Sequence, residues 1–300
     1  MPERILIVVA GPTAVGKTSI AVRLAQYFNT EVLSADSRQI YKEMSIGTAK
    51  PDASEMQGVI HHFVDSHSIS EDFNAGVFER ESLQLLDNLF QKHKVVILAG
   101  GTGLFIRALL QGMDTFPVIL PGVRESLNKI REEQGVEVLQ QMLKEKDPEY
   151  YQQVDIHNPQ RVIRALEVCL SSGQPYSSFR TGNKTPRNFT PIYIGLERTR
   201  EELNQRIDLR MDEMLEKGLV EEVKRLLQYK DLNALKTVGY REVIDFLEGQ
   251  YDEAEMIRLL KQNSRNYAKR QMTWFKKEDV VWFHPDQWEE ILLLINERVK

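Results

Sequence analysis

Short apolar runs recur along the chain and alternate with longer amphipathic segments. Residues 5–10 form a β-branched and apolar run closed by glycine, as is typical of a strand buried in a parallel sheet. Further runs of this kind lie at 31–35, 95–100, 191–196 and 279–284. Apolar residues at helical spacing follow at 17–28 and 77–90. This alternation predicts an α/β fold with a parallel sheet and right-handed crossovers.

The segment between the third and fourth predicted strands has no convincing strand pattern. Helical patterns cover 122–134, 136–146 and 158–171. Pro117 and Pro121 mark its beginning, and a loop-rich stretch at 171–188 marks its end. We therefore expect an all-helical insertion domain at 114–190. An α/β core at 1–113 and 191–300, with a long helical region at 199–277, would carry it.

Composition places the chain among ordinary globular proteins. It has 300 residues, 42% of them hydrophobic and 28% charged, with a net charge of −5. Any surface for nucleic acid must therefore be local, which makes Lys and Arg clusters informative. The single cysteine, Cys169, excludes an intramolecular disulfide and suits a reducing compartment. Its apolar neighbours indicate a buried structural thiol.

Nothing in the hydrophobic pattern indicates a membrane segment. The N-terminal apolar run is too short for a signal peptide, and no stretch approaches the roughly 20 residues that span a bilayer. We expect a cytoplasmic, monomeric protein that does not bind membranes.

Residues 11–18 match the phosphate-loop motif G-x-x-x-x-G-K-[ST]. The eight positions are Gly11, Pro12, Thr13, Ala14, Val15, Gly16, Lys17 and Thr18. They lie between a predicted strand and a predicted helix, where backbone N–H groups and a helix N-terminus bind anions. Lys17 adds a positive charge, and a hydroxyl at the position of Thr18 commonly binds Mg²⁺. We expect a core like that of the P-loop NTPases, with a nucleotide or another phosphate compound on the loop.

Many nucleotide hydrolases complete such a site with an acidic residue at the end of a later strand. The strand at 95–100 runs into Gly100-Gly101-Thr102-Gly103 without an acid, which disfavours an ATPase motor or a GTPase switch. Asp36 follows the second strand, at the sheet edge where ligands bind in open α/β folds. It is either a proton acceptor or a turn aspartate before Ser37, and its position alone favours neither.

Two basic clusters stand out against the acidic average. In the first, Arg161 and Arg164 lie on one face of a helix at 158–171. The second, at 258–277, has seven Lys or Arg residues and no acid. Arg258, Lys261, Arg265 and Lys269 form a helical stripe, and Tyr267, Trp274 and Phe275 are interleaved. Such a stripe can follow a phosphate backbone while aromatic rings stack on bases. The alternative is a solvated helix face with aromatic residues in the core.

Nine motifs occur together in this chain in a fixed order. They are GPTAVGKTS (11–19), DSRQIYK (36–42), GTAKP (47–51), HHFVD (61–65), GGTGLFIRAL (100–109), PGVR (121–124), NPQRVIRALEV (158–168), TVGYRE (237–242) and RNYAKRQMTWF (265–275). With these motifs the chain resembles the tRNA dimethylallyltransferases, also called tRNA isopentenyltransferases, over essentially its whole length. Phe105 stands where a tyrosine is usual in that family. The chain has no zinc finger of the eukaryotic type, which indicates the bacterial type.

The resemblance implies a specific reaction. The phosphate loop would hold the diphosphate of dimethylallyl diphosphate, with Mg²⁺ on Thr18. The dimethylallyl group would move to N6 of the adenosine on the 3′ side of the tRNA anticodon. Asp36 would accept the N6 proton, Thr102 would help to hold the base, and Arg210 would stabilise the leaving diphosphate. The insertion and the core would both bind the anticodon stem-loop of the tRNA.

The resemblance and the basic clusters together predict the tRNA-binding residues. They are Asp36, Ser37, Arg38, Gln39, Thr102, Arg124, Gln160, Arg161, Val162, Ile163, Arg164, Arg265 and Lys269. Three alternatives compete with this reading. A small-molecule kinase would bind ATP on the loop and use Arg161 and Arg164 as lid residues. A free-nucleotide (AMP) isopentenyltransferase would not need the insertion, and a non-catalytic RNA-binding protein would not need Asp36 and Thr102.

Overall fold

The computed structural model describes residues 4–182 and 185–299. The chain separates into two compact units. The core unit is formed by Met1–Gln111 and Pro186–Lys300, and the insertion unit by Gly112–Thr185. The expected insertion bounds of 114 and 190 differ slightly, because Thr190 already belongs to a strand of the core sheet.

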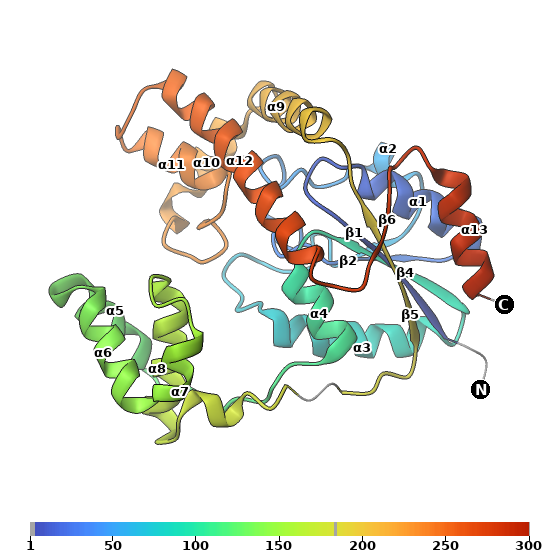
Figure 1. Ribbon diagram of the computed structural model, residues 1–300. Helices are drawn as coiled ribbons and strands as arrows, with labels where there is room; N and C mark the ends of the chain where they lie inside the picture. The colour runs from blue at the N-terminus through green and yellow to red at the C-terminus, as the bar shows by residue number, and fades with distance from the viewer. Residues whose placement is uncertain (1–3, 183–184, 300) are drawn as a thin grey trace. The chain divides into compact units, whose positions relative to one another are not determined.

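A six-stranded sheet forms the centre of the core unit, in the order β3-β2-β4-β1-β5-β6 (Figure 1). All five strand pairings are parallel. The strands are β1 Ile5–Ala10, β2 Val32–Ser34, β3 His61–His62, β4 Val95–Gly100, β5 Thr190–Leu196 and β6 Val281–Phe283. The predicted α/β class with a parallel sheet is confirmed. The pattern missed β3, because two histidines carry no apolar signal.

Helices of the core unit pack on both faces of this sheet and beyond the carboxyl ends of its strands (Figure 1). They are α1 Lys17–Phe28, α2 Ala53–Met56, α3 Ala75–Leu89, α4 Gly103–Gln111, α9 Arg200–Glu216, α10 Leu219–Leu226, α11 Tyr240–Leu247, α12 Glu253–Phe275 and α13 Trp288–Arg298. Side chains of β1 alternate between two hydrophobic clusters. Leu6 and Val8 pack with residues of α3, α4 and α12, whereas Ile7 and Val9 pack with residues of α1, α9 and α13.

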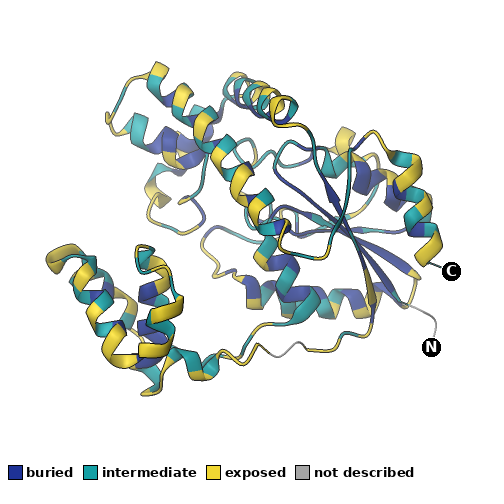
Figure 2. Ribbon diagram, viewed as in Figure 1, coloured by how far each residue is buried: buried dark blue, intermediate teal, exposed yellow. Residues whose placement is uncertain are grey.

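Strand β1 is buried along its whole length, as the dark blue strands in Figure 2 show. Full burial of an aliphatic side chain stabilises the fold by about 1.5–3 kcal/mol. The carboxyl end of this strand is therefore a rigid support for the loop that follows it.

The insertion unit is helical and has a hydrophobic core of its own. Its elements are α5 Val123–Gln134, α6 Val136–Lys146, α7 Pro148–Gln153, α8 Pro159–Ser172 and the short 3₁₀ helix η1 Tyr176–Phe179. The Asn158 side chain accepts a hydrogen bond from the N–H of Arg161 and caps α8, and Pro159 occupies its first turn. Cys169 is 4% exposed, as predicted for a structural thiol. Within the described ranges, no helix is both long and apolar enough to cross a bilayer.

Candidate functional site

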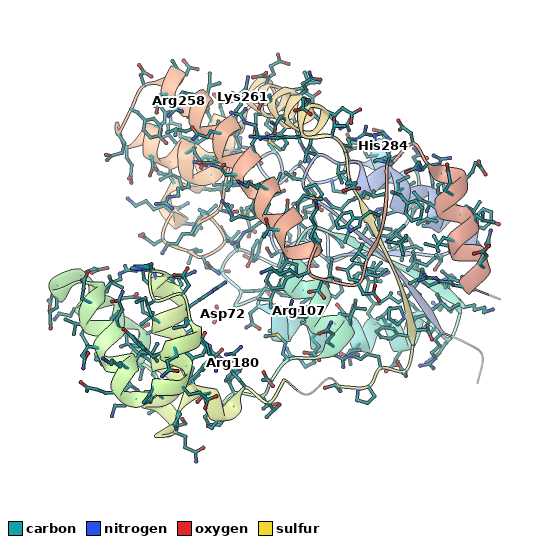
Figure 3. The ribbon with its side chains drawn as sticks, in the orientation of Figure 1. Asp72, Arg107, Arg180, Arg258, Lys261 and His284 are labelled. Carbon is teal, nitrogen blue, oxygen red and sulfur yellow. The ribbon has the colours of Figure 1, made fainter. Side chains whose placement is uncertain are left out.

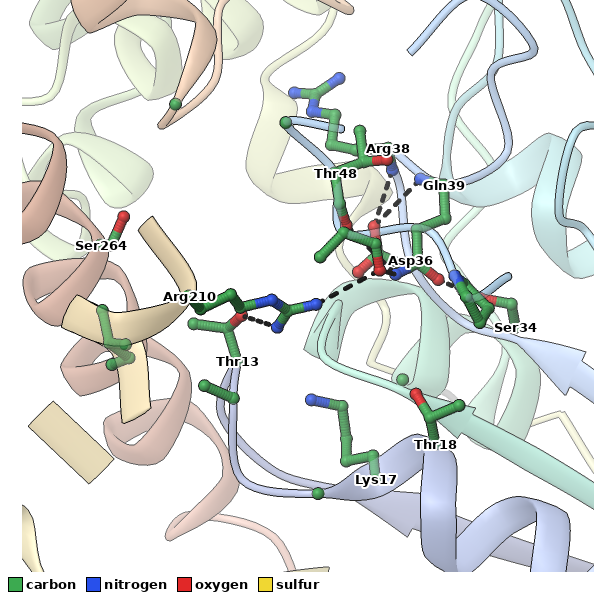
Figure 4. A pocket seen from close by; sticks show the side chains of 18 of the residues that line it. Thr13, Lys17, Thr18, Ser34, Asp36, Arg38, Gln39, Thr48, Arg210 and Ser264 are labelled. Carbon is green, nitrogen blue, oxygen red and sulfur yellow. Dashed lines mark hydrogen bonds between the residues drawn. The ribbon is translucent and has the colours of Figure 1, made fainter. Parts of the chain in front are cut away.

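A pocket of about 490 Å³ opens at the carboxyl ends of β1, β2 and β4. Nine of the predicted site residues line it: Thr13, Ala14, Gly16, Lys17, Thr18, Asp36, Arg38, Gln39 and Arg210. All of them belong to the core unit. The close-up in Figure 4 shows Lys17, Asp36 and Arg210 around this pocket.

The backbone of the phosphate loop is arranged for an anion. Carbonyl oxygens of Ala14 and Val15 accept hydrogen bonds from the Nε of Arg206 at 2.8 Å and of Arg198 at 3.0 Å. In a trans peptide the next N–H points the opposite way, so the N–H groups of Val15 and Gly16 face away from these cations. Among the described residues neither N–H has a hydrogen-bond acceptor. The loop therefore offers free donors to a phosphate.

Lys17 is the cation that the phosphate loop itself supplies to the pocket. Its Nζ donates a hydrogen bond to the carbonyl oxygen of Pro12 at 2.7 Å. Burial lowers the pKa of Lys17 to about 8; Asp36 opposes this shift and Arg210 adds to it. An entering anion would raise this pKa again and stabilise the ammonium form.

Arg210 of α9 bridges the phosphate loop and the loop after β2. Its Nη1 donates to the Thr13 hydroxyl at 3.2 Å and its Nη2 to the Ala49 carbonyl oxygen at 3.2 Å (Figure 4). Burial lowers the pKa of Arg210, and Asp36 opposes this effect. A guanidinium stays charged in proteins, so the pocket contains a fixed cation beside the loop.

The Asp36 carboxylate has two different oxygens. Its Oδ1 accepts the N–H of Arg38 at 2.9 Å and of Gln39 at 3.3 Å, as in an Asx turn. No donor lies within hydrogen-bond distance of Oδ2 in the part of the chain that the structure describes. The turn reading and the proton-acceptor reading are therefore compatible, because each uses its own oxygen.

Thr102 lies behind the Asp36 turn and is not among the residues that line the pocket. Its Oγ1 accepts the N–H of Ser37 at 3.0 Å and is 3.3 Å from the Ser37 hydroxyl. The role of Thr102 in holding a base therefore stays a prediction. Its visible role is to hold the segment that presents Asp36.

The missing carboxylate at the end of β4 has a steric cause. A Cβ atom on Gly100 would lie 2.2 Å from the carbonyl oxygen of Ala35 in the adjacent segment. No acidic residue fits there, so the pocket takes its carboxylate from Asp36 instead.

The loop at 45–49 is held by a buried carboxylate of α10. Glu222, 3% exposed, accepts the N–H groups of Ser45, Ile46 and Gly47 at 2.8–3.1 Å and the hydroxyl of Tyr240 at 2.6 Å. The Tyr240 pKa is raised by burial and by the Glu222 charge. This network connects the GTAKP and TVGYRE motifs, and it fixes the loop whose Ala49 carbonyl holds Arg210.

Comparison with known proteins agrees with this geometry. A family profile described as IPP transferase matches residues 39–278. The tRNA dimethylallyltransferase of Cytophaga hutchinsonii is 57% identical over 99% of this chain and 98% of its own length. The chain belongs to the tRNA dimethylallyltransferase family. The Christiangramia forsetii enzyme of the same name is 47% identical over 94% of both chains.

Solved structures share the fold of this tRNA dimethylallyltransferase family member. The tRNA isopentenylpyrophosphate transferase of Bacillus halodurans superposes with a TM-score of 0.73 at 35% identity, over 99% of this chain and 97% of that one. A eukaryotic dimethylallyltransferase described as acting on tRNA superposes with a TM-score of 0.79 at 28% identity. This chain covers 76% of that protein.

The basic stripe on α12 is largely neutralised by acids, two of them on α9 and one in the first turn of α12 itself. Lys261 pairs with Asp212 of α9 at 2.6 Å and Arg265 pairs with Asp208 (Figure 3 labels Arg258 and Lys261 on α12). Arg258 pairs with Glu255 at 2.6 Å. Asp212 and Asp208 lie 49 and 57 residues away from their partners in the chain, so the sequence could not indicate these two pairings. Of the four stripe residues, only Lys269 has no carboxylate within 4 Å among the described residues.

Two of the three aromatic residues of α12 pack with the hydrophobic core, which favours the core interpretation over base stacking for them. Phe275 is fully buried, and Trp274 packs against Gly103 and under the guanidinium of Arg107 at 4.5 Å. Tyr267 alone lines the pocket, where burial raises its pKa to about 12.

In the insertion unit, two arginines share one buried carboxylate. Glu167 is 2% exposed and accepts hydrogen bonds from Arg124 and from Arg164. The arginine side chains remain 50% and 40% exposed, and Gln160 and Arg161 are exposed. Val162 and Ile163 were predicted to contact tRNA, and this was wrong for their side chains. Both side chains are fully buried in the core of the unit. In an amphipathic helix the residues between Arg161 and Arg164 face the opposite side, towards the core.

Motif matching named no role for four further residues that line the pocket. These are His61, Arg206, Ser264 and Gln271. His61 lies in HHFVD and Gln271 in RNYAKRQMTWF, so the motifs included both residues. They did not indicate that these side chains line the pocket. Nδ1 of His61 donates to the Val59 carbonyl at 3.0 Å, which leaves Nε2 as an acceptor. That Nε2 is buried and has no partner among the described residues.

Proposed function

We propose that this protein transfers a dimethylallyl group from dimethylallyl diphosphate to N6 of adenosine 37 in tRNA, on the 3′ side of the anticodon. Membership of the tRNA dimethylallyltransferase family is the observation that carries this function. The pocket supports it, because it combines free backbone donors, two cations and a carboxylate with one unpaired oxygen.

The diphosphate is assigned to residues 11–18. N–H groups of Val15 and Gly16, the Lys17 ammonium and the Arg210 guanidinium would surround the leaving group. As the C–O bond of the allyl ester breaks, the electron pair remains on the diphosphate oxygen, and fixed donors stabilise the growing negative charge. Contacts of Arg210 with Thr13 and Ala49 hold this cation in place before substrate enters.

Asp36 is assigned to the acceptor side of the reaction. The N6 nitrogen of adenine forms the new N–C bond and must lose one proton. We assign that proton to Oδ2 of Asp36, because Oδ1 is already occupied by the N–H groups of Arg38 and Gln39. Thr102 would act through Ser37 to hold this turn.

We also propose Mg²⁺ as the ion that accompanies the diphosphate on Thr18. Mg²⁺ is usually held by one or two protein groups together with waters and substrate phosphates. The residues fit this mode: the Thr18 hydroxyl lines the pocket, and the unpaired Nε2 of His61 can accept a hydrogen bond from a metal-bound water. No described cluster of three or more His, Cys, Asp or Glu residues could form a cage. When bound, the ion would neutralise charge on the diphosphate.

For tRNA we propose exposed and half-buried polar residues of both units. Arg38, Gln39 and Lys269 are candidates in the core unit, and Arg124, Gln160, Arg161 and Arg164 in the insertion unit. Base extraction from an anticodon loop costs only a few kcal/mol, because the base is not paired.

One labelling experiment tests the function. The protein is incubated with Mg²⁺, labelled dimethylallyl diphosphate, unmodified tRNA, AMP and ATP, and the products are separated. We expect label in tRNA, released on digestion as N6-isopentenyladenosine, and none when guanosine replaces adenosine 37. Label in AMP would indicate a free-nucleotide enzyme. Consumption of ATP without transfer of label would indicate a kinase.

A further inference from the structure

The side chain of Gln271 in α12 connects two loops of the pocket. Its Oε1 accepts the N–H of Thr13 in the phosphate loop at 2.8 Å. Its Nε2 donates to the carbonyl oxygen of Gly101, after β4, at 2.9 Å. The residue is 7% exposed, and both contacts span more than a hundred residues of sequence. The hydrogen bonds of this amide to two backbone groups therefore depend on how α12 packs against the two loops, and not on the sequence around Gln271.

The glycine at 101 is required by this contact. A Cβ atom at Gly101 would lie 2.3 Å from Nε2 of Gln271, closer than such atoms approach. The amide therefore occupies the space that any other residue at 101 would fill. This contact explains why the second residue of GGTG is a glycine, which the neighbouring sequence does not indicate.

The two loops joined by Gln271 have different roles. Thr13 belongs to the loop assigned to the diphosphate. Gly101 precedes Thr102, whose hydroxyl accepts the N–H of Ser37 next to Asp36. A path therefore leads from the diphosphate loop to the Asp36 turn: hydrogen bonds join Thr13 to Gln271 and Gln271 to Gly101, the backbone joins Gly101 to Thr102, and a hydrogen bond joins Thr102 to Ser37.

We propose that Gln271 is a positioning residue that sets the distance between the diphosphate loop and Asp36. This inference rests on the proposed function, since it concerns the alignment of donor and acceptor in that reaction. An amide is required, because it alone among side chains of this size both accepts from Thr13 and donates to Gly101. Small errors in the alignment of reacting atoms lower the rate strongly.

The first test compares substitutions at 271. Gln271→Met keeps the length of the side chain and removes both hydrogen bonds. Gln271→Glu keeps the acceptor for Thr13 but places an oxygen against the Gly101 carbonyl. Gln262→Met is the matched control on the same helix, since Gln262 is exposed and contacts only Arg258 there.

Three quantities are measured at a temperature where each variant is folded: the single-turnover rate of prenyl transfer, the affinity for inorganic diphosphate with Mg²⁺, and the affinity for tRNA. For Gln271→Met we expect the rate to fall at least about tenfold, which corresponds to the loss of one such contact. Diphosphate affinity should fall less, and tRNA affinity should stay within about twofold. A wild-type rate in folded Gln271→Met or Gln271→Glu would overturn the proposal.

The second test needs no activity, so it remains decisive if the proposed function fails. Gly101→Ala should lower the melting temperature in the wild-type background because of the clash with the amide. In the Gln271→Ala background the same change should lower it much less, since the space is then open. Equal losses in both backgrounds would show that Gln271 does not occupy this position. Wild-type protein that transfers no label would refute the proposed function alone.

Discussion

At the scale of single residues, Asp36 is where the chemistry can be tested most directly. Asp36→Asn preserves Oδ1, which accepts the two turn N–H groups, and replaces Oδ2 by an amide that cannot accept a proton. We expect single-turnover prenyl transfer to fall about 10²–10⁴-fold, as for loss of a general base. Affinity for tRNA and thermal stability should change little, because the turn is retained. Transfer at the wild-type rate would remove Asp36 from the mechanism.

Lys17 links the function of the pocket to the pH dependence of stability. Its folded pKa of about 8 lies below its ordinary value of 10.5. The unfolded chain therefore binds more protons between these values, and the contribution of Lys17 to stability rises as pH rises through that window. At neutral pH both states are protonated, so the full cost of burying the charge is present, roughly 3 kcal/mol.

From this cost we predict that Lys17→Met raises the melting temperature at pH 7 and that the gain disappears towards pH 10.5. The same variant should lose diphosphate binding and prenyl transfer while tRNA binding stays within a few-fold. In the wild-type protein, diphosphate affinity should decrease as pH rises through about 8. Thermal melts and calorimetric titrations with diphosphate between pH 6 and 10 check both statements. A Lys17→Met protein that is less stable than wild type at pH 7 would contradict the predicted direction of the stability change.

At the scale of elements, α12 divides into a structural and a binding part. Arg265 is paired with Asp208 of α9, whereas Lys269 is exposed and has no acid within 4 Å among the described residues. We expect Lys269→Ala to weaken tRNA binding several-fold, as loss of one phosphate contact does. Arg265→Ala should mainly lower the melting temperature, because it leaves the half-buried Asp208 without its partner. Filter binding and thermal melts of both variants separate these effects, and a larger loss of tRNA affinity in Arg265→Ala would refute the division.

At the scale of the whole molecule, the net charge of −5 means that tRNA binding must rely on local basic groups. We expect tRNA affinity to fall steeply with salt, because each neutralised phosphate releases a counterion. Arg161→Ala in the insertion unit should weaken binding. It should also make the slope of log K against log salt shallower by about one, the contribution of one phosphate contact. Diphosphate affinity should not change. Titrations from low to physiological salt test this, and Gln141→Ala, on an exposed helix face of the same unit, serves as control.

Local patterns determined the architecture of this protein. The apolar runs that predicted strands at 5–10 and 95–100 form β1 and β4 over these same residues, because a strand buried on both faces needs a continuous apolar run. The phosphate-loop motif defined its own geometry, since strand, loop and helix N-terminus are adjacent in sequence. The order of nine motifs was sufficient to indicate the family.

Only the tertiary structure decided which charges are free and what holds the site together. Asp208 and Asp212 neutralise Arg265 and Lys261 from a different helix, so a stretch of sequence without acids was not a free basic surface. Gln271 reaches Thr13 from 258 positions away. Such contacts depend on which elements pack together, and neither periodicity nor composition records that. The sequence by itself predicted the strands with continuous apolar runs and named candidate reacting groups, whereas packing decided the partners of those groups.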